Sequence, residues 1–161
     1  MSIIPNWHPV FVHFTVASLT LAVVFYLLAR VFGSESLRQQ WRIVANWLLW
    51  SGVALTLITV LTGGYAFNTV QHDDPSHLVM KEHRLLALTT FLVFLGLAVW
   101  AFMLQRGGKS LNGLFIGLAL IGVVILGSTA WHGGELVYRH GLGVISLPQK
   151  SAHMHGDADH H

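Results

Sequence analysis

Histidine is the residue type in this sequence that is best suited to chemistry, and most of its copies fall in one region of the predicted fold. Imidazole is the commonest protein ligand for metals and haem iron, and it is costly to leave unpaired near a bilayer. Seven of the eleven histidines lie near segment ends that would meet at one rim: His8, His13, His72, His77, His83, His132 and His140. The opposite rim has none. This pattern indicates a cofactor or metal site at one membrane face.

The elements that position these histidines are four apolar segments. Only 10% of the 161 residues are charged, whereas a soluble domain carries about 25%. The apolar segments cover about residues 9–32, 44–66, 76–105 and 111–132, each long enough to span a bilayer. With short links between them, they predict an all-α integral membrane protein, an antiparallel up-down bundle of four transmembrane helices within residues 1–147. Residues 148–161 lose all apolar periodicity, which predicts a disordered, histidine-rich tail.

Local signals indicate where the helices begin and end. Pro9 suits a first helical turn, and Asp74 followed by Pro75 is a helix start signal. We expect the second and fourth spans to end in glycine pairs, after Thr62 and His132 respectively. The first residues lack the positive segment of a cleaved signal peptide, so the first span is expected to remain in the mature protein. No internal repeat stands out.

The sequence also excludes several kinds of chemistry. Because the chain has no cysteine, it has no thiolate-held iron–sulfur cluster, no disulfide and no covalently attached c-type haem. It has no basic cluster of the type that binds nucleic acid, and no zinc-protease, nucleophile-elbow or phosphate-loop motif. An electron-transfer protein is therefore favoured over a stand-alone enzyme.

Two histidines meet the requirements for haem ligation best. In an up-down bundle the first and third helices are diagonal partners, and His13 and His83 lie at broadly matching depth inside them. Neighbouring helix axes stand about 8–10 Å apart, so a diagonal is roughly 12–14 Å. This gap suits two imidazoles with a six-coordinate iron between them, and it is too wide for a zinc ion held by those two alone. The sequence therefore predicts a b-type haem with His13 and His83 as axial ligands.

The surroundings supply the other parts of a haem site. Glycines at the same rim would let a flat macrocycle approach the backbone: Gly63, Gly64, Gly133 and Gly134. Lys81, Arg84 and Arg139 are candidate partners of the haem propionates. His132 and His140 are rival axial ligands, hydrogen-bond donors to the ligands, or ligands of a separate metal. Together with His8 they also leave enough cofactor-binding histidines for a second haem.

Two other functions stay open at this point. A copper- or zinc-binding carrier, sensor or transporter component would use His132, His140, Glu135 and the tail as nitrogen and oxygen ligands. A subunit that only packs against a larger complex would need none of the histidines. For His72 and His77 a solvated polar role is the simpler interpretation.

The distribution of lysine and arginine predicts the orientation. The histidine-free links hold five of these residues and the histidine side holds four: Arg30, Arg38, Arg42, Arg106 and Lys109, against Lys81, Arg84, Arg139 and Lys150. This weak bias places the histidine-free links in the cytoplasm, and both termini with the histidine rim on the periplasmic side of a bacterial inner membrane. The expected partners are the lipid bilayer, a quinone and another redox protein, with assembly into an oligomer or larger complex left open.

Three segments of the chain also carry a resemblance. They resemble a family of bacterial membrane proteins that contain the domain of unknown function 2231, over about residues 4–147. The segments that carry the resemblance are HPVFVHFTVASL, EHRLLAL and HGGELVYRHGLGV. The matching residues are His8, His13, His83, His132, Gly133, Gly134, Tyr138, His140 and Gly141. The family typically has proline where this chain has Thr15. The resemblance implies a four-span membrane domain and says little about function, so the haem hypothesis rests on the bundle geometry.

Overall fold

Four long helices make up the described part of this computed structural model, which comprises residues 7–69, 74–109 and 111–144. They are α1 (His8–Val31), α2 (Glu35–Thr69), α3 (Asp74–Arg106) and α4 (Gly113–Tyr138). All four are long and apolar enough to cross a membrane. The predicted all-helical, four-span fold is therefore confirmed. His72 and the predicted tail, residues 148–161, lie outside the described residues.

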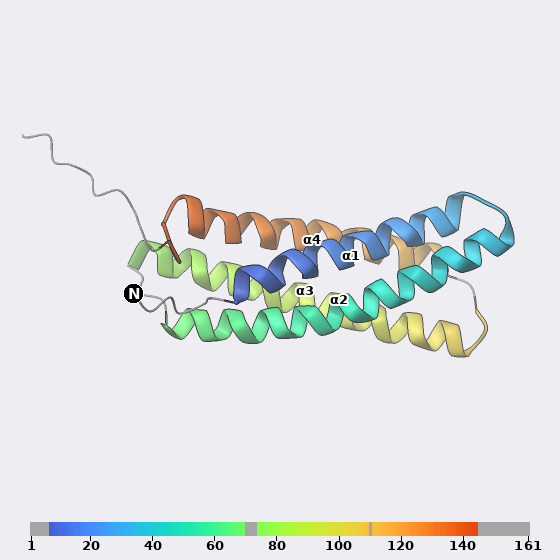
Figure 1. The fold of residues 1–161 in the computed structure, drawn as a ribbon, viewed down its shortest axis with the longest axis horizontal. Helices are drawn as coiled ribbons and strands as arrows, with labels where there is room; N and C mark the ends of the chain where they lie inside the picture. Colours follow the sequence, from blue (N-terminus) through green and yellow to red (C-terminus); the bar gives the residue numbers. More distant parts are fainter. Residues whose placement is uncertain (1–6, 70–73, 110, 145–161) are drawn as a thin grey trace, which may run out of the picture.

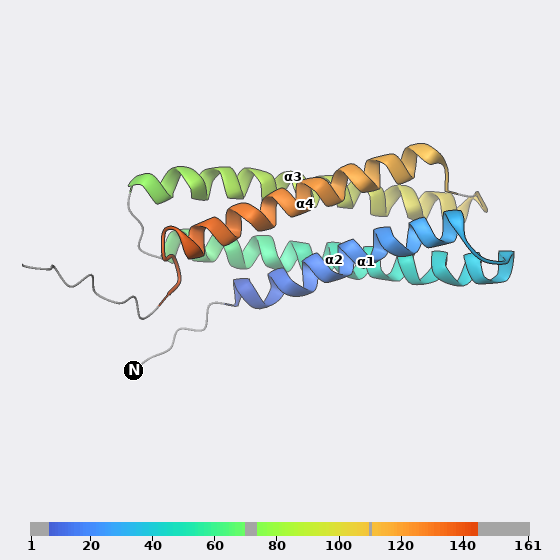
Figure 2. The same ribbon diagram turned by 90° about the horizontal axis from the view of Figure 1, so that it is seen from above.

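The helices lie side by side along one axis and alternate in direction (Figures 1 and 2). Helix α1 packs against α2 and α4, and α3 packs against the same two, so α1 and α3 are diagonal partners. The start of α1 and the end of α4 lie at the same end of the bundle (Figure 1). This end also contains the end of α2 and the start of α3, and we call it the histidine end. The opposite end, with the α1–α2 and α3–α4 links, is the arginine end.

The link between α1 and α2 is shorter than the sequence predicts. After Val31 the chain turns at Phe32, Gly33 and Ser34, and Gly33 has a φ of +86°, which favours glycine. The hydroxyl of Ser34 accepts a hydrogen bond from the backbone N–H of Leu37, at 3.5 Å, and α2 begins at Glu35. Residues 33–43, which the predicted spans leave as a connection, are therefore mostly helix. Glutamate, leucine, arginine and glutamine are good helix formers once the start is capped.

The two glycine pairs do not end their helices, which corrects a second expectation. Helix α2 continues through Gly63 and Gly64 to Thr69, and α4 continues through Gly133 and Gly134 to Tyr138. Glycine ends a helix mainly when the chain must enter a left-handed conformation, and none of these four has a positive φ. The expected start of α3 at Asp74 and Pro75 is confirmed.

Aromatic and aliphatic side chains fill the middle of the bundle towards the arginine end. Tyr26 and Phe115 contact each other edge to face, with ring centroids 5.0 Å apart, and Trp100 packs on Phe115 at 5.6 Å. Leu19 and Phe94 continue this core towards the histidine end, and both are fully buried. The core thus holds the four helices in register and leaves the histidine end to polar side chains.

Candidate functional site

Two histidines face each other across the bundle at the histidine end. His8 lies on α1 and His83 on its diagonal partner α3, and both side chains are half-buried. Their ring centroids are 6.3 Å apart, and the ring planes are nearly perpendicular, at 84°. Diagonal helices in this bundle meet at few other places, so the two imidazoles occupy the space between them.

Each ring is held by a carbonyl group on the neighbouring helix. Nδ1 of His8 lies 3.0 Å from the carbonyl oxygen of Thr59 on α2, and Nδ1 of His83 lies 3.1 Å from that of Thr129 on α4. A carbonyl only accepts, so Nδ1 is the protonated nitrogen and donates in both bonds. A neutral ring then has its lone pair on Nε2. Metal-binding histidines are commonly oriented in this way, through the ring nitrogen that does not bind the metal.

A glycine packs against each histidine ring, and it lies on the same helix as the carbonyl group that accepts the hydrogen bond of that ring. A Cβ atom at Gly63 would lie 2.8 Å from Cε1 of His8, and one at Gly133 would lie 3.1 Å from Cε1 of His83. The second glycine of each pair contacts no histidine ring: a Cβ at Gly64 would meet nothing within 4 Å, and one at Gly134 would meet only Cδ2 of Tyr138, at 4.0 Å. Gly63 and Gly133 therefore leave the room that the imidazoles fill.

The arrangement in α1 and α2 is repeated in α3 and α4. Threonine hydroxyls meet between the helices of each pair, at 2.9 Å for Thr15 and Thr59 and at 2.8 Å for Thr90 and Thr129. Deeper in the bundle, a glycine packs against a core side chain in each pair: Gly52 on Leu19, and Gly122 on Phe94. The two helix pairs are thus two copies of one unit, each of which supplies one histidine.

This repeat corrects the expectation that the chain has none, and the sequence does contain its signal. In both α2 and α4 a glycine is followed by a threonine seven residues later and by a glycine pair that begins four residues after that. In both α1 and α3 a threonine follows the histidine by seven residues. The match is hard to see because the intervening apolar residues differ. In addition, the separation along the chain between the two histidines differs from that between the two glycines.

The sequence predicts that His13 lies opposite His83, but in the structure it does not. Its side chain is exposed, and its Nδ1 is bonded to the carbonyl of Pro9 in the same helix. The reason is the helical phase: His8 and His13 are five residues apart, which is a rotation of about 140° around an α-helix. Only one of them can face the centre of the bundle, and in this structure it is His8.

The remaining predicted site residues lie around the pair. His132 is half-buried, one residue before Gly133, and its Nδ1 is bonded to the carbonyl of Ser128 in its own helix. His140 follows the end of α4 and is half-buried. Among the described residues, no three histidine, aspartate or glutamate side chains come close enough to hold a metal ion together. His132, His140 and Glu135 are therefore not part of such a group among these residues, and the tail that the copper or zinc hypothesis also uses lies outside them.

The candidate propionate partners are all at the histidine end, but they differ in their contacts. Arg139 forms an ion pair with Glu135, at 2.7 Å. Arg84 is exposed and stacks over the ring of Phe67, at 5.4 Å from the ring centroid. Lys81 is exposed to solvent one turn before Arg84. Arg84 and Lys81 thus provide positive charge at this end, whereas the charge of Arg139 is largely neutralised.

These features define a class: a four-span membrane bundle built from two similar helix pairs, with paired histidines near one end. The chain belongs to the family described as predicted membrane protein (DUF2231), whose model matches residues 5–146. This confirms the resemblance that the sequence motifs indicate. No curated protein and no solved structure matches the chain.

Proposed function

We propose that this protein is a b-type cytochrome of the membrane, and that His8 and His83 would hold the iron of its haem. The observation that carries the proposal is the pair itself: two imidazoles on diagonal helices, 6.3 Å apart, each oriented through Nδ1 by a carbonyl of a neighbouring helix. The proposal keeps the haem and the third-helix ligand expected from the sequence. It replaces His13 by His8.

The separation of the rings supports a single metal atom between them. Two metal–nitrogen bonds of about 2 Å each, with roughly 1 Å from each nitrogen to its ring centre, give a centroid distance of about 6 Å. Both rings are also directed by hydrogen bonds that a ligand histidine needs for its tautomer and orientation.

The number of protein ligands favours haem over a bare metal ion. Zinc sites use three or four protein ligands, and the described residues hold no such group around the two histidines. A porphyrin supplies four nitrogens itself and needs only two axial ligands from the protein. Helix bundles commonly hold such cofactors between side chains of facing helices. Gly63 and Gly133 would keep the backbone of α2 and α4 free of side chains beside the rings.

When bound, the haem would supply one-electron transfer. The chain's residues would orient the ligands through Thr59 and Thr129, exclude water with the apolar core, and provide positive charge for the propionates through Lys81 and Arg84. We propose that the electrons pass between quinol in the bilayer and an external redox protein at the histidine end. Lysine and arginine counts support placing this end on the periplasmic side of a bacterial inner membrane.

The test is a reduced-minus-oxidised absorption spectrum of protein purified after expression with an adequate supply of haem. We expect the bands of a low-spin b-type haem in the parent protein. His8→Ala and His83→Ala should each remove most of the haem or leave a high-spin, five-coordinate centre. His13→Ala is the matched control, because it removes an imidazole from the same helix end without touching the pair, and it should leave the spectrum unchanged.

Two outcomes would contradict the proposal. Purified parent protein without a Soret band would exclude a haem protein, and stoichiometric copper or zinc in the same preparation would favour the carrier or sensor hypothesis instead. A spectrum that is lost in His13→Ala and retained in His8→Ala would restore the ligand pair expected from the sequence.

A further inference from the structure

A second polar site lies at the arginine end, far from the histidines. It is a pocket of about 170 Å³ between the end of α1, the start of α2 and the link that precedes α4, and it is lined by Tyr26, Ala29, Arg30, Glu35, Arg38, Arg42 and Leu111. Its lining thus combines three guanidinium groups with one carboxylate. The proposed function uses none of these residues.

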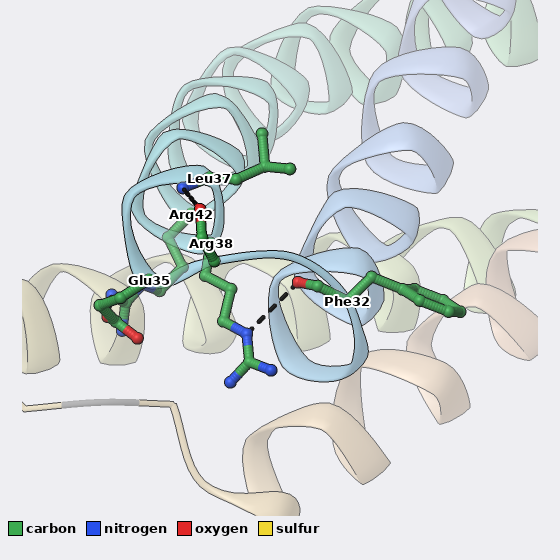
Figure 3. A network of polar contacts seen from close by, with 6 residues as sticks. Phe32, Glu35, Leu37, Arg38 and Arg42 are labelled. Atoms are coloured by element: carbon green, nitrogen blue, oxygen red, sulfur yellow. Dashed lines mark hydrogen bonds and ion pairs between the residues drawn. The ribbon is translucent and has the colours of Figure 1, made fainter.

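The ion pairs in this pocket leave it positively charged. Arg42 is paired with Glu35, at 2.8 Å, so one arginine is neutralised. Arg38 is oriented by its Nε, which donates to the carbonyl oxygen of Phe32 at 3.3 Å (Figure 3). Arg30 contributes a further positive charge from the last turn of α1. Two guanidinium charges therefore remain without a carboxylate in the pocket lining.

The inner wall of the pocket is rigid. The Tyr26 side chain is buried, and its hydroxyl donates to Oδ1 of Asn46 at 2.6 Å. The amide of Asn46 in turn donates to Oε1 of Gln105 on α3, at 2.9 Å. This chain of hydrogen bonds links three helices beside the arginines, so the cationic groups project from a fixed framework.

The pocket also lies where phospholipid headgroups would be. Its helices end their membrane-spanning segments at this level, and the adjacent Val31 and Phe32 are exposed apolar side chains. Leu114, in the first turn of α4, is exposed as well. Apolar side chains next to a cationic pocket are suited to acyl chains whose phosphate occupies the pocket.

We propose that this pocket binds the phosphate of an anionic phospholipid. Guanidinium groups recognise phosphate through paired, charge-assisted hydrogen bonds, and the volume admits one headgroup phosphate. The exposed apolar side chains beside the pocket favour a lipid over free phosphate. The site is independent of the proposed haem function, and either proposal can fail without the other.

The experiment measures lipid retention by native mass spectrometry. The protein is released from nanodiscs of phosphatidylcholine that contain a minor share of phosphatidylglycerol. For the parent protein we expect retained lipid to be strongly enriched in phosphatidylglycerol. The double variant Arg30→Gln/Arg38→Gln should lower this enrichment by at least about tenfold, because two charge-assisted contacts to the phosphate are lost.

Arg106→Gln is the control for the loss of one guanidinium charge at the same end, because Arg106 lies outside the pocket and stacks on Phe102. It should keep the enrichment of the parent. Arg38→Lys retains the charge without the planar donor group and should give an intermediate value. If the double variant loses its helical circular dichroism, Arg38→Lys and Arg30→Gln alone decide the result.

Equal loss of phosphatidylglycerol enrichment in the double variant and in Arg106→Gln would overturn the proposal. Positive charge anywhere at this end would then account for lipid retention, without a specific pocket. An unenriched parent would also overturn it. Inorganic phosphate that displaces phosphatidylglycerol at millimolar concentration would assign the pocket to free phosphate instead of a lipid.

Discussion

Each histidine ring packs against a glycine of the neighbouring helix. Gly63 faces His8 and Gly133 faces His83. A methyl group added at either glycine would lie closer to the ring than ordinary van der Waals contact allows. The neighbouring Gly64 faces open space. Two adjacent glycines of one helix thus have different roles, because their Cα–H bonds point about 100° apart around the helix axis.

This difference gives a prediction for single methyl groups. Gly63→Ala should displace the His8 ring, destabilise the protein by about 1–3 kcal/mol and reduce haem content. Gly64→Ala should be neutral or slightly stabilising, because alanine favours a helix by up to about 1 kcal/mol over glycine. The measurement is thermal unfolding together with the absorbance of bound haem. Equal effects of the two substitutions would show that Gly63 does not set the position of the ring.

At the scale of elements, the unit of this structure is a helix pair. In each pair a histidine of the first helix is bonded to a threonine carbonyl of the second, and the hydroxyl of the same threonine meets a threonine of the first helix. Two such pairs pack with their histidines towards each other. Each ring is therefore held by a hydrogen bond within its own helix pair.

Adjacent threonines of α3 allow the bond between helices to be tested. The Thr90 hydroxyl contacts Thr129 on α4 in addition to its own helix, whereas the Thr89 hydroxyl donates within α3, to the carbonyl of Leu85. Thr90→Val should therefore destabilise the bundle by about 0.6–2 kcal/mol, the range for hydrogen bonds between membrane helices. Thr89→Val should change the free energy of unfolding much less.

The readout for both variants is unfolding in mixed detergent micelles, followed by circular dichroism. If Thr90→Val proves as stable as Thr89→Val, the hydroxyl pair contributes no net stability and the helices are held by packing alone.

For the whole molecule, the two ends of the bundle differ in chemistry. The histidine end carries the paired imidazoles, and the arginine end carries the cationic pocket, with an apolar core between them. A protein with such unlike ends needs one orientation in the membrane for a redox role. The excess of lysine and arginine at the arginine end favours the cytoplasm for that end.

The absence of cysteine allows this orientation to be tested cleanly. Tyr138→Cys places a thiol at a 90% exposed position at the histidine end, and Ser36→Cys places one at an exposed position at the arginine end. In intact cells with a permeable outer membrane, a membrane-impermeant maleimide should label Tyr138→Cys alone. Ser36→Cys should be labelled only after lysis. The reverse pattern would invert the proposed orientation, and the cysteine-free parent gives the background.

The sequence by itself determined the membrane fold. Low charge and four long apolar segments left only a helical bundle, because lipid requires every backbone hydrogen bond to be satisfied within the segment. It also determined the start of α3 at Asp74 and the end of the bundle at which the histidines lie. These features depend on local composition and on the order of segments, and both can be read along the chain.

Only the tertiary structure decided which histidine faces which. The choice between His8 and His13 depends on the phase of α1 relative to α2 and α3, and that phase is set by packing of Leu19 on Gly52 and by the bond from His8 to Thr59. The repeat of the helix pairs and the pocket at the arginine end likewise join residues that are distant in the sequence. Contacts between helices fix such features, and of these only the repeat leaves a signal in the sequence, in its matched glycine and threonine spacings.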